Sequence, residues 1–425
     1  MLVGPFRQLL TMDAMPLRGA LSDHQLEIIT DAGILMQEGK IVATGAFGEL
    51  AEKYPGEQCV RLQEDFVAFP GLVDVHTHCC WAGSRAGDYA SRLAGKSYLD
   101  IAKEGGGILD TVRKTRAASF DSLVQYTVDK ANDHLYRGVT TLEVKSGYGL
   151  SVADELKILE AIREASKRTD ADLVATCLAA HVVPPEFKTA TGHTDQPDAD
   201  QYRYLDYLCS ELLPEVIKRK LSSRIDIFVE QGAFSPDAAL GYLMAASDMG
   251  FDVLLHGDQF SVGAAELANE VHALSIDHLE AATITEVITL ANGNTIPVAL
   301  PGASVGLGEP FAPARKLLDA GNSLAIASDW NPGSAPMGNL ITLAAILGAA
   351  QKLSMAEVWA AITCRAAAAL KLFDRGVLRA GMVADLIAFK TNDYREVLYR
   401  QGELRPSLLI KKGKLLPIYK NEEKE

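Results

Sequence analysis

Cysteine is scarce in this chain, which excludes a disulfide scaffold. The 425 residues include six cysteines, and no pair has the C-x-x-C spacing that is typical of structural zinc sites and redox motifs. Cys79 and Cys80 directly follow a histidine pair, but adjacent side chains on a strand diverge, so we interpret them as packing residues. Reduced thiols are typical of the cytosol, and we therefore expect a cytoplasmic protein.

Long apolar runs and an excess of positive charge are also missing. The sequence has no stretch of about 18 uncharged apolar residues, which a membrane-spanning helix needs, and it does not begin with the basic and apolar segments of a signal peptide. The formal net charge of −14 disfavours nucleic acid and anionic membranes as partners. We therefore expect a small-molecule ligand, and the sequence leaves a homodimer open.

The chain is long enough for two structural units, because one core stops growing at roughly 250–300 residues. Residues 1-69 contain the hairpin pattern Gly33–Thr44, and residues 374-425 contain the strand pattern Ala384–Phe389 and the hairpin pattern Leu408–Leu416. Each end is too small to bury a core alone. We therefore expect both ends to combine into one small β-sandwich domain.

Between these ends, residues 70-373 alternate apolar strand candidates with segments of helical period. Eight such strands over about 300 residues are typical of a (β/α)8 TIM barrel, an α/β fold in which the chemistry takes place at the carboxyl ends of the strands. The predicted strands are Phe66–His78, Val139–Lys145, Leu173–Ala180, Ile225–Glu230, Val253–His256, Ala273–His278, Ile296–Leu300 and Leu324–Ser328.

Histidines concentrate at these carboxyl ends. Because side chains alternate along a strand, the two imidazoles of the first strand should point to the same face. Five of the nine histidines end a predicted strand or directly follow one, and so does one aspartate; these residues are His76, His78, His181, His256, His278 and Asp329. The other histidines are expected in loops or helices, and we assign no role to His24, His134, His193 and His272.

Three neutral imidazoles and one carboxylate suit one divalent cation, with zinc or iron as the candidates. We predict that the metal ligands are His76, His78, His256 and Asp329. His278 is then predicted to act as a general acid or base, with a purely structural role as the alternative. Asp329 could also accept a proton, and the sequence leaves open which of the two is the main acceptor.

The sequence around these residues resembles that of the amidohydrolase superfamily and, within it, that of the imidazolonepropionase family. The H-x-H pair alone marks the superfamily, whereas the Gly-Gly-Gly-Ile, Lys-Ser-Gly-Tyr-Gly and Asp-x-Asn-Pro-Gly-Ser stretches together mark the family. The similar stretches span nearly the whole chain and include Pro70–His78, Gly83–Arg85, Gly105–Arg113, Glu143–Leu150, Ala180–Glu186, His256–Gln259, Asp277–Glu280 and Ser328–Ser334.

This resemblance implies a metal-dependent cyclic amide hydrolase, which converts 4-imidazolone-5-propanoate to N-formimidoyl-L-glutamate in histidine degradation by means of metal-activated water. A guanidinium group suits the propionate carboxylate of such a substrate. A solvated loop charge is the alternative role for Arg85, and an ordinary turn is the alternative for Asn331. The resemblance implies that the substrate contacts are Arg85, Tyr148, His181, Gln259, Asn331, Gly333 and Ser334.

Two departures from related enzymes narrow this expectation. Binuclear relatives carry a carbamylated lysine at the end of the fourth strand, where it bridges two metals. Here the fourth strand ends in Glu230, and the nearby lysine, Lys145, belongs to the second strand. We therefore expect one metal. Related deaminases usually carry a glutamate where this chain has Gln259, and an amide cannot titrate. A metal-dependent deaminase of a related heterocycle is therefore disfavoured but stays open. A barrel that serves as an inactive scaffold would be expected to have lost a ligand.

Overall fold

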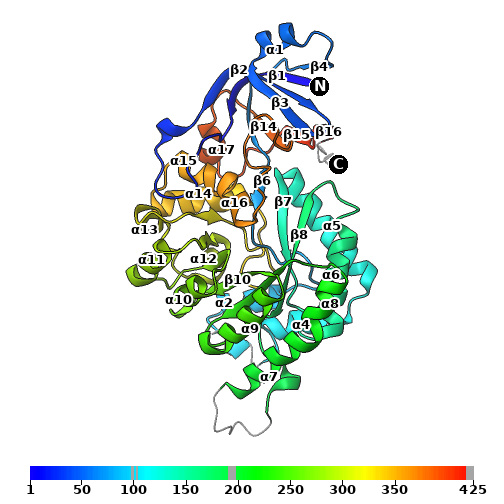
Figure 1. The fold of residues 1–425 in the computed structure, drawn as a ribbon, viewed down its shortest axis with the longest axis vertical. Coiled ribbons are helices and arrows are strands. Elements are labelled where there is room, and N and C mark those ends of the chain that lie inside the picture. Colours follow the sequence, from blue (N-terminus) through cyan, green and yellow to red (C-terminus); the bar gives the residue numbers. More distant parts are fainter. Residues whose placement is uncertain (97–99, 102–103, 190–197, 418–425) are drawn as a thin grey trace.

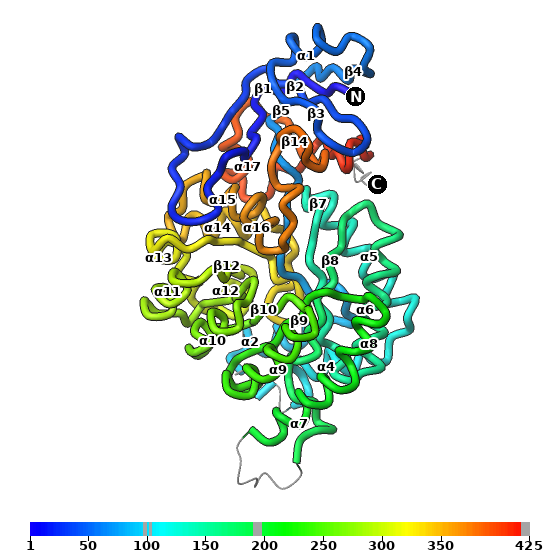
Figure 2. The backbone as a smooth tube through the Cα atoms, viewed as in Figure 1, coloured from blue at the N-terminus to red at the C-terminus, as the bar shows by residue number. Residues whose placement is uncertain are grey.

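The computed structural model describes residues 1–96, 100–101, 104–189 and 198–417. The chain forms a barrel and a second sheet, built from both chain ends, that lies at one end of the barrel (Figure 1). Figure 2 shows the blue amino-terminal and the red carboxyl-terminal segments meeting in this sheet. Within the described ranges, no helix combines the length and apolar character that crossing a membrane requires.

The barrel contains eight parallel strands in sequence order. A parallel bridge between Thr77 and Trp330 closes it, and the backbone N–H of Asp329 donates to the carbonyl of His76 over 3.0 Å. The predicted number of barrel strands is therefore confirmed. They are β6 (Leu72–Asp74), β7 (Val139–Lys145), β8 (Asp172–Ala180), β9 (Arg224–Val229), β10 (Asp252–Gly257), β11 (Ser275–His278), β12 (Ile296–Ala299) and β13 (Ala325–Ile326).

Helices cover the outside of the barrel, so both faces of most strands are buried, as is usual for parallel sheets. Several helices begin with a side-chain cap, such as the capping box of Thr283 and Glu286. The helices are α2 (Ala86–Leu93), α4 (Ile108–Ala117), α5 (Phe120–Tyr136), α6 (Val152–Ala165), α7 (Ala199–Tyr207), α8 (Leu213–Lys218), α9 (Pro236–Asp248), α10 (Ala264–Glu270), α11 (Ile284–Ala291), α12 (Pro301–Leu307), α13 (Ala314–Asp319), α14 (Leu340–Gln351), α15 (Met355–Ala361) and α16 (Cys364–Ala369).

The terminal sheet joins the two chain ends through an antiparallel pair of β5 and β14. Side chains from six of its strands, among them Phe6, Ile34 and Leu386, share one buried core, so the predicted union of the two ends is confirmed. Its strands are β1 (Leu2–Leu10), β2 (Ile28–Gln37), β3 (Lys40–Ala46), β4 (Cys59–Arg61), β5 (Phe66–Pro70), β14 (Leu386–Lys390), β15 (Leu408–Lys411) and β16 (Lys414–Leu416); its helices are α1 (Phe47–Lys53) and α17 (Arg395–Tyr399).

The strand predicted over Phe66–His78 is interrupted at Gly71, and this prediction was wrong. The chain leaves the terminal sheet after β5 and enters the barrel as β6. At the junction the N–H of Gly71 donates to the carbonyl of Asp385, and a Cβ on Gly71 would lie 2.3 Å from Thr140 Oγ1. A glycine is therefore required where the chain crosses between the two sheets.

Ion pairs attach the terminal sheet to the base of the barrel. Asp172, at the first position of β8, accepts from Lys411 Nζ over 2.8 Å, from Lys412 Nζ over 2.6 Å and from Arg375 Nη1 over 2.7 Å. Burial would raise the pKa of Asp172, but these three cations lower it to about 2. The carboxylate therefore stays ionised and links the two parts of the chain.

Candidate active site

The first barrel strand leads directly into a pair of histidines whose ring nitrogens face each other. His76 Nε2 and His78 Nε2 lie 3.3 Å apart, while the Thr77 hydroxyl points away and donates to the carbonyl of Glu143. Backbone hydrogen bonds to both neighbouring strands keep this segment extended beyond β6. The predicted common face of the two imidazoles therefore results from barrel closure as well as from the alternation along a strand.

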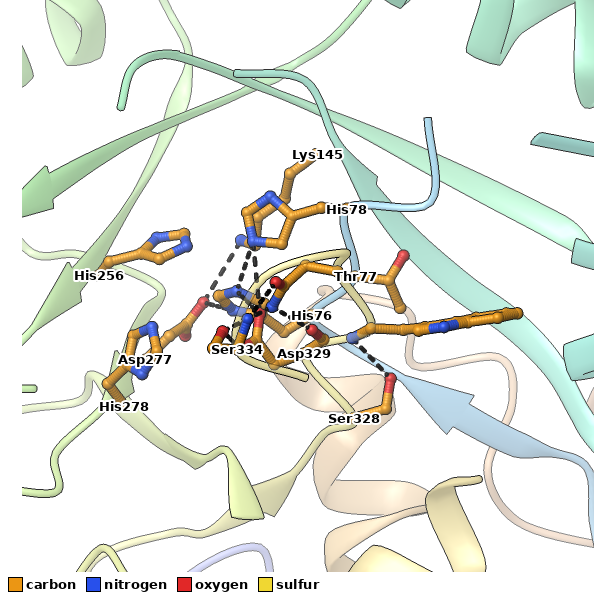
Figure 3. Close-up of polar contacts among 12 residues, drawn as sticks. His76, Thr77, His78, Lys145, His256, Asp277, His278, Ser328, Asp329 and Ser334 are labelled. Atoms are coloured by element: carbon orange, nitrogen blue, oxygen red, sulfur yellow. Dashed lines mark hydrogen bonds and ion pairs between the residues drawn. The ribbon is translucent and has the colours of Figure 1, made fainter. Parts of the chain in front are cut away.

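His256 and Asp329 approach the same centre from β10 and from the segment after β13 (Figure 3). His256 Nδ1 lies 3.1 Å from Asp226, and its Nε2 is buried without a hydrogen-bond partner among the described residues. Asp329 Oδ1 lies 3.5 Å from the Nε2 atoms of both His76 and His78. Asp329 has φ +54°, a strained conformation of the kind that clusters at functional sites.

The donor set fits a divalent cation. One ring nitrogen from each of His76, His78 and His256 lies within 4.8 Å of the others, and all three side chains are buried. Burial lowers the pKa of His76 well below its usual range and that of His256 to about 4, so both rings are neutral. Neutral imidazoles with convergent lone pairs are the ligands that zinc and related metals prefer.

Buried carboxylates fix the orientation of two of these rings. His76 Nδ1 lies 2.6 Å from Asp277 Oδ2, and His256 Nδ1 has the corresponding contact with Asp226. Such partners hold a metal-binding imidazole with its other nitrogen directed at the metal. Asp226 and Asp277 were not among the predicted site residues, although Asp277 directly precedes His278 at the end of β11.

His278 lies beside His76, His78 and His256, which we call the histidine group. Its ring centroid is 5.4 Å from that of His256. Its Nδ1 faces Glu280 at 3.4 Å. Burial would lower the pKa of His278, but the charge and hydrogen bond of Glu280 outweigh it and raise this pKa. A basic imidazole next to neutral ones has the properties of a proton carrier.

A pocket opens next to the histidine group, and every residue that was predicted to contact the substrate lines it. His181 stacks on His78, with the ring planes 17° apart. Sequence reasoning missed Arg92 and the apolar part of the wall. The residues that line the pocket are His78, Arg85, Arg92, Ile108, Tyr148, His181, Val182, Phe228, His256, Gln259, Phe260, His278, Leu307, Asp329, Asn331, Gly333 and Ser334.

Arg85 and Arg92 place two guanidinium groups at one side of the pocket. Arg85 Nε donates to Asp88 over 2.8 Å, and a Cβ on Gly333 would lie 2.2 Å from Arg85 Nη1. Arg92 Nη2 donates to the carbonyl of Gly333 over 3.1 Å. A signal for Arg92 was available, because it lies seven residues after Arg85 and two helical turns place such residues on the same face.

The loop that carries Tyr148 is shaped by a buried glutamate in the first turn of α6. Glu155 accepts from the backbone N–H groups of Gly147, Gly149 and Leu150 over 2.7–3.0 Å. Gly147 has φ +109° and its carbonyl contacts His181 Nδ1 at 3.1 Å. The two glycines that flank Tyr148 thus permit the close approach of this loop to His181 and to Glu155.

Asn331 shapes its own loop. Its Oδ1 accepts from the N–H groups of Gly333 and Ser334 over 2.7 and 2.9 Å, and its Nδ2 donates to the carbonyl of Asp329 over 2.7 Å. This pattern is the Asx type of turn. The turn brings Ser334 Oγ to 3.3 Å from Asp329 Oδ2, so both roles considered for Asn331 are compatible with its place in the pocket wall.

The remaining candidates lie outside this group of residues. Burial raises the pKa of Cys79 to about 12 and that of Cys80 to about 11, so both are protonated thiols that pack in the core. His134 is completely buried on α5 and packs against Trp330. His193 lies outside the described residues.

Comparison with known proteins identifies the family to which the chain belongs. Residues 67–416 match the model of the amidohydrolase family. Imidazolonepropionase from Bacillus velezensis is 38% identical over 96% of this chain and 94% of its own length. Imidazolonepropionase from Bdellovibrio bacteriovorus is 37% identical over 93% of this chain and 90% of its own length.

Two solved structures show the same fold at low sequence identity. Atrazine chlorohydrolase from Arthrobacter aurescens, complexed with zinc, matches with a TM-score of 0.69 at 17% identity over 98% of this chain and 94% of its own. Guanine deaminase from C. acetobutylicum, with bound guanine, matches with a TM-score of 0.70 at 15% identity over 98% and 99%. Because residues 67–416 match the family model and the two imidazolonepropionases are 37–38% identical over nearly the whole chain, the chain belongs to the amidohydrolase family, and within it to the imidazolonepropionases.

Proposed function

We propose that the chain hydrolyses the cyclic amide of 4-imidazolone-5-propanoate to N-formimidoyl-L-glutamate, as a cytoplasmic enzyme of histidine degradation. The observation that carries this proposal is the shared pocket of the histidine group and Arg85. A hydrolytic centre and an anion-binding guanidinium group next to it suit a small heterocycle with a carboxylate tail. We assign catalysis to the barrel, residues 70-373, because every residue of the site belongs to it.

We assign one zinc or iron ion per chain to this site. Its ligands would be the Nε2 atoms of His76, His78 and His256 together with a carboxylate oxygen of Asp329. When bound, such an ion acts as a Lewis acid that polarises a carbonyl group and activates water. The hydrogen bonds that Asp277 and Asp226 accept from the Nδ1 atoms of His76 and His256 hold these two rings in the orientation that this requires.

The proton transfers are assigned to Asp329 and His278. The His78 contact outweighs burial and lowers the pKa of Asp329, so its carboxylate is ionised and can accept the proton of the attacking water. Because His278 Nδ1 faces Glu280, its Nε2 can donate a proton to the ring nitrogen when the carbon–nitrogen bond breaks. Two groups whose environments push their pKa values apart can divide the acid and base roles in this way.

The substrate would be held by its tail and by its ring. Arg85 offers a planar fork for the carboxylate, which a lysine cannot replace. Tyr148 and His181 lie on the side of His78 and can pack against a planar ring. Phe228 and Phe260 add apolar wall on the side of β9 and β10, which limits the access of bulk water.

A direct assay distinguishes this reaction from the rival deamination. The protein would be incubated with freshly made 4-imidazolone-5-propanoate, and the loss of ultraviolet absorbance and the release of ammonia would be followed together, against a sample without enzyme. The proposal predicts loss of absorbance with N-formimidoyl-L-glutamate as the product and no ammonia. Unchanged absorbance would refute the proposed hydrolysis and would favour the alternative, a deaminase of a related heterocycle.

A further inference from the structure

Lys145 lies at the centre of a buried charged cluster below the histidine group. Its Nζ is 2.7 Å from Asp226 Oδ2, 2.8 Å from Glu143 Oε2 and 3.3 Å from Asp277 Oδ2. All four side chains have an exposed fraction of zero. One ammonium group is therefore shared by three carboxyl groups in a part of the barrel that water does not reach.

This cluster is directly connected to the proposed metal ligands. Asp277 and Asp226 are the two carboxyl groups that contact the Nδ1 atoms of His76 and His256. Figure 3 shows Lys145 directed toward the same centre as these imidazoles. Lys145 therefore acts on the metal centre through the carboxyl groups and makes no contact that would qualify it as a ligand.

The same carboxyl groups belong to two further sets of potential metal ligands, each of which shares one histidine with the proposed metal site. His76, Glu143 and Asp277 place one ligand atom each within 4.8 Å of one another, and so do Asp226, His256 and Asp277. Lys145 Nζ contacts every carboxyl group in both sets. The space in which these oxygens converge is thus taken by a cation that belongs to the chain.

We propose that the Lys145 ammonium group takes the place of a second metal ion and thereby limits this centre to one. The inference rests on the proposed metal site and specifies its stoichiometry. A buried carboxylate cluster that loses this ammonium group is left with uncompensated charge, which is strongly unfavourable. A divalent cation that enters through the neighbouring histidine group would relieve this charge.

A lysine in this setting is poorly suited to carbamylation. Burial would lower the pKa of Lys145, but the charges of Asp226, Glu143 and Asp277 outweigh burial and raise this pKa above its usual range. Carbamylation requires the neutral amine. The ammonium form therefore replaces a second metal rather than helping to bind one.

The test measures metal content and needs no substrate. Metal-free wild type and Lys145→Met would be dialysed against excess zinc and then against buffer, and bound zinc per chain would be determined by elemental analysis. We expect about one zinc in the wild type and about two in Lys145→Met. Lys145→Arg, which keeps the positive charge, should bind one.

A matched control is available in the terminal sheet. Lys411 is also buried, and its Nζ contacts Asp385 and Asp172 at 2.5 and 2.8 Å far from the histidine group. Lys411→Met removes the same functional group from the same kind of environment and should bind one zinc. A second zinc in this control as well would show that buried carboxylates take up zinc regardless of position, and would overturn the inference.

If Lys145→Met does not fold, the double variant Lys145→Met/Glu143→Gln removes one of the carboxylates and still leaves the set of Asp226, His256 and Asp277. It should bind two zinc ions. One zinc in either folded variant, or two in the wild type at any zinc concentration below precipitation, would overturn the inference. A wild type that binds one zinc but leaves the imidazolone intact would instead refute the proposed function.

Discussion

Asp277 Oδ2 lies 2.6 Å from His76 Nδ1, and both side chains are completely buried. This contact leaves His76 Nε2 as the nitrogen that faces His78 and Asp329. The hydrogen bond therefore selects which nitrogen of His76 can bind a metal, and a residue on β11 controls a ligand that follows β6.

The first prediction concerns this contact. Asp277→Asn preserves the size of the side chain but removes its charge, so His76 loses a strong acceptor and becomes a weaker ligand. We expect the zinc affinity to fall by about 10–100-fold, the usual effect of losing such a partner, as measured by competition with a chelator. Asp385→Asn changes a buried carboxylate of the terminal sheet and should leave the affinity unchanged. Equal affinities for Asp277→Asn and the wild type would contradict this role.

The second prediction separates proton transfer from metal binding. His278→Asn should retain the metal content of the wild type, because the ligands are assigned elsewhere, while kcat falls by roughly 10²–10⁴-fold, the usual contribution of general acid–base catalysis. His78→Asn should lose metal and activity together. Elemental analysis and initial rates of the two variants check this. If His278→Asn lost its metal as readily as His78→Asn, His278 would be a ligand, and His181 would become the next candidate for proton transfer.

The third prediction tests the position of Arg85. In Gly333→Ala the new Cβ would lie 2.2 Å from Arg85 Nη1, so the guanidinium group must move. Loss of one charged hydrogen bond costs about 1.5–3 kcal/mol, and we expect kcat/KM to fall at least about tenfold, mainly through KM, with the metal content unchanged. In Gly241→Ala the Cβ meets no other atom within 4 Å, which makes it the matched control. Unaltered kinetics in Gly333→Ala would remove Arg85 from the substrate site.

The fourth prediction concerns the attachment of the terminal sheet. The pKa of Asp172 is about 2 in the folded protein and about 3.9 in an unfolded chain. A lowered pKa means that this carboxylate stabilises the fold above about pH 4 and loses that effect as the pH falls toward 2. After allowance for solvent screening, Asp172→Asn should lower the free energy of unfolding by about 1 kcal/mol at neutral pH.

Urea unfolding of the wild type and Asp172→Asn at pH 7 and at pH 3 would check this. The difference between the two proteins should shrink at the lower pH. Asp31→Asn, at an exposed position, should change the free energy of unfolding little at either pH. A difference that stays constant between the two pH values would show that the charge of Asp172 does not stabilise this junction.

Local patterns in the sequence predicted the barrel and most of the site, because apolar runs and the polar residues that end them are neighbours in the chain. His76, His78, His256 and Asp329 could be found in this way. The roles of Asp226, Asp277 and Lys145 could not, because they depend on which side chains meet across the inside of a closed barrel. The break at Gly71 was missed for a related reason, since both of its halves are apolar and the crossing between sheets is set by tertiary contacts.

The proposed hydrolysis requires a single metal ion in the group of His76, His78, His256 and Asp329. The most direct test adds zinc in small increments to the metal-free protein and measures, for each sample, the bound metal and the rate of absorbance loss of 4-imidazolone-5-propanoate. Without metal, we expect the rate to equal that of the enzyme-free sample. It should then rise in proportion to bound zinc and stop rising at about one zinc per chain. Full activity of the metal-free protein, or a rate that appears only with the second equivalent, would contradict this requirement.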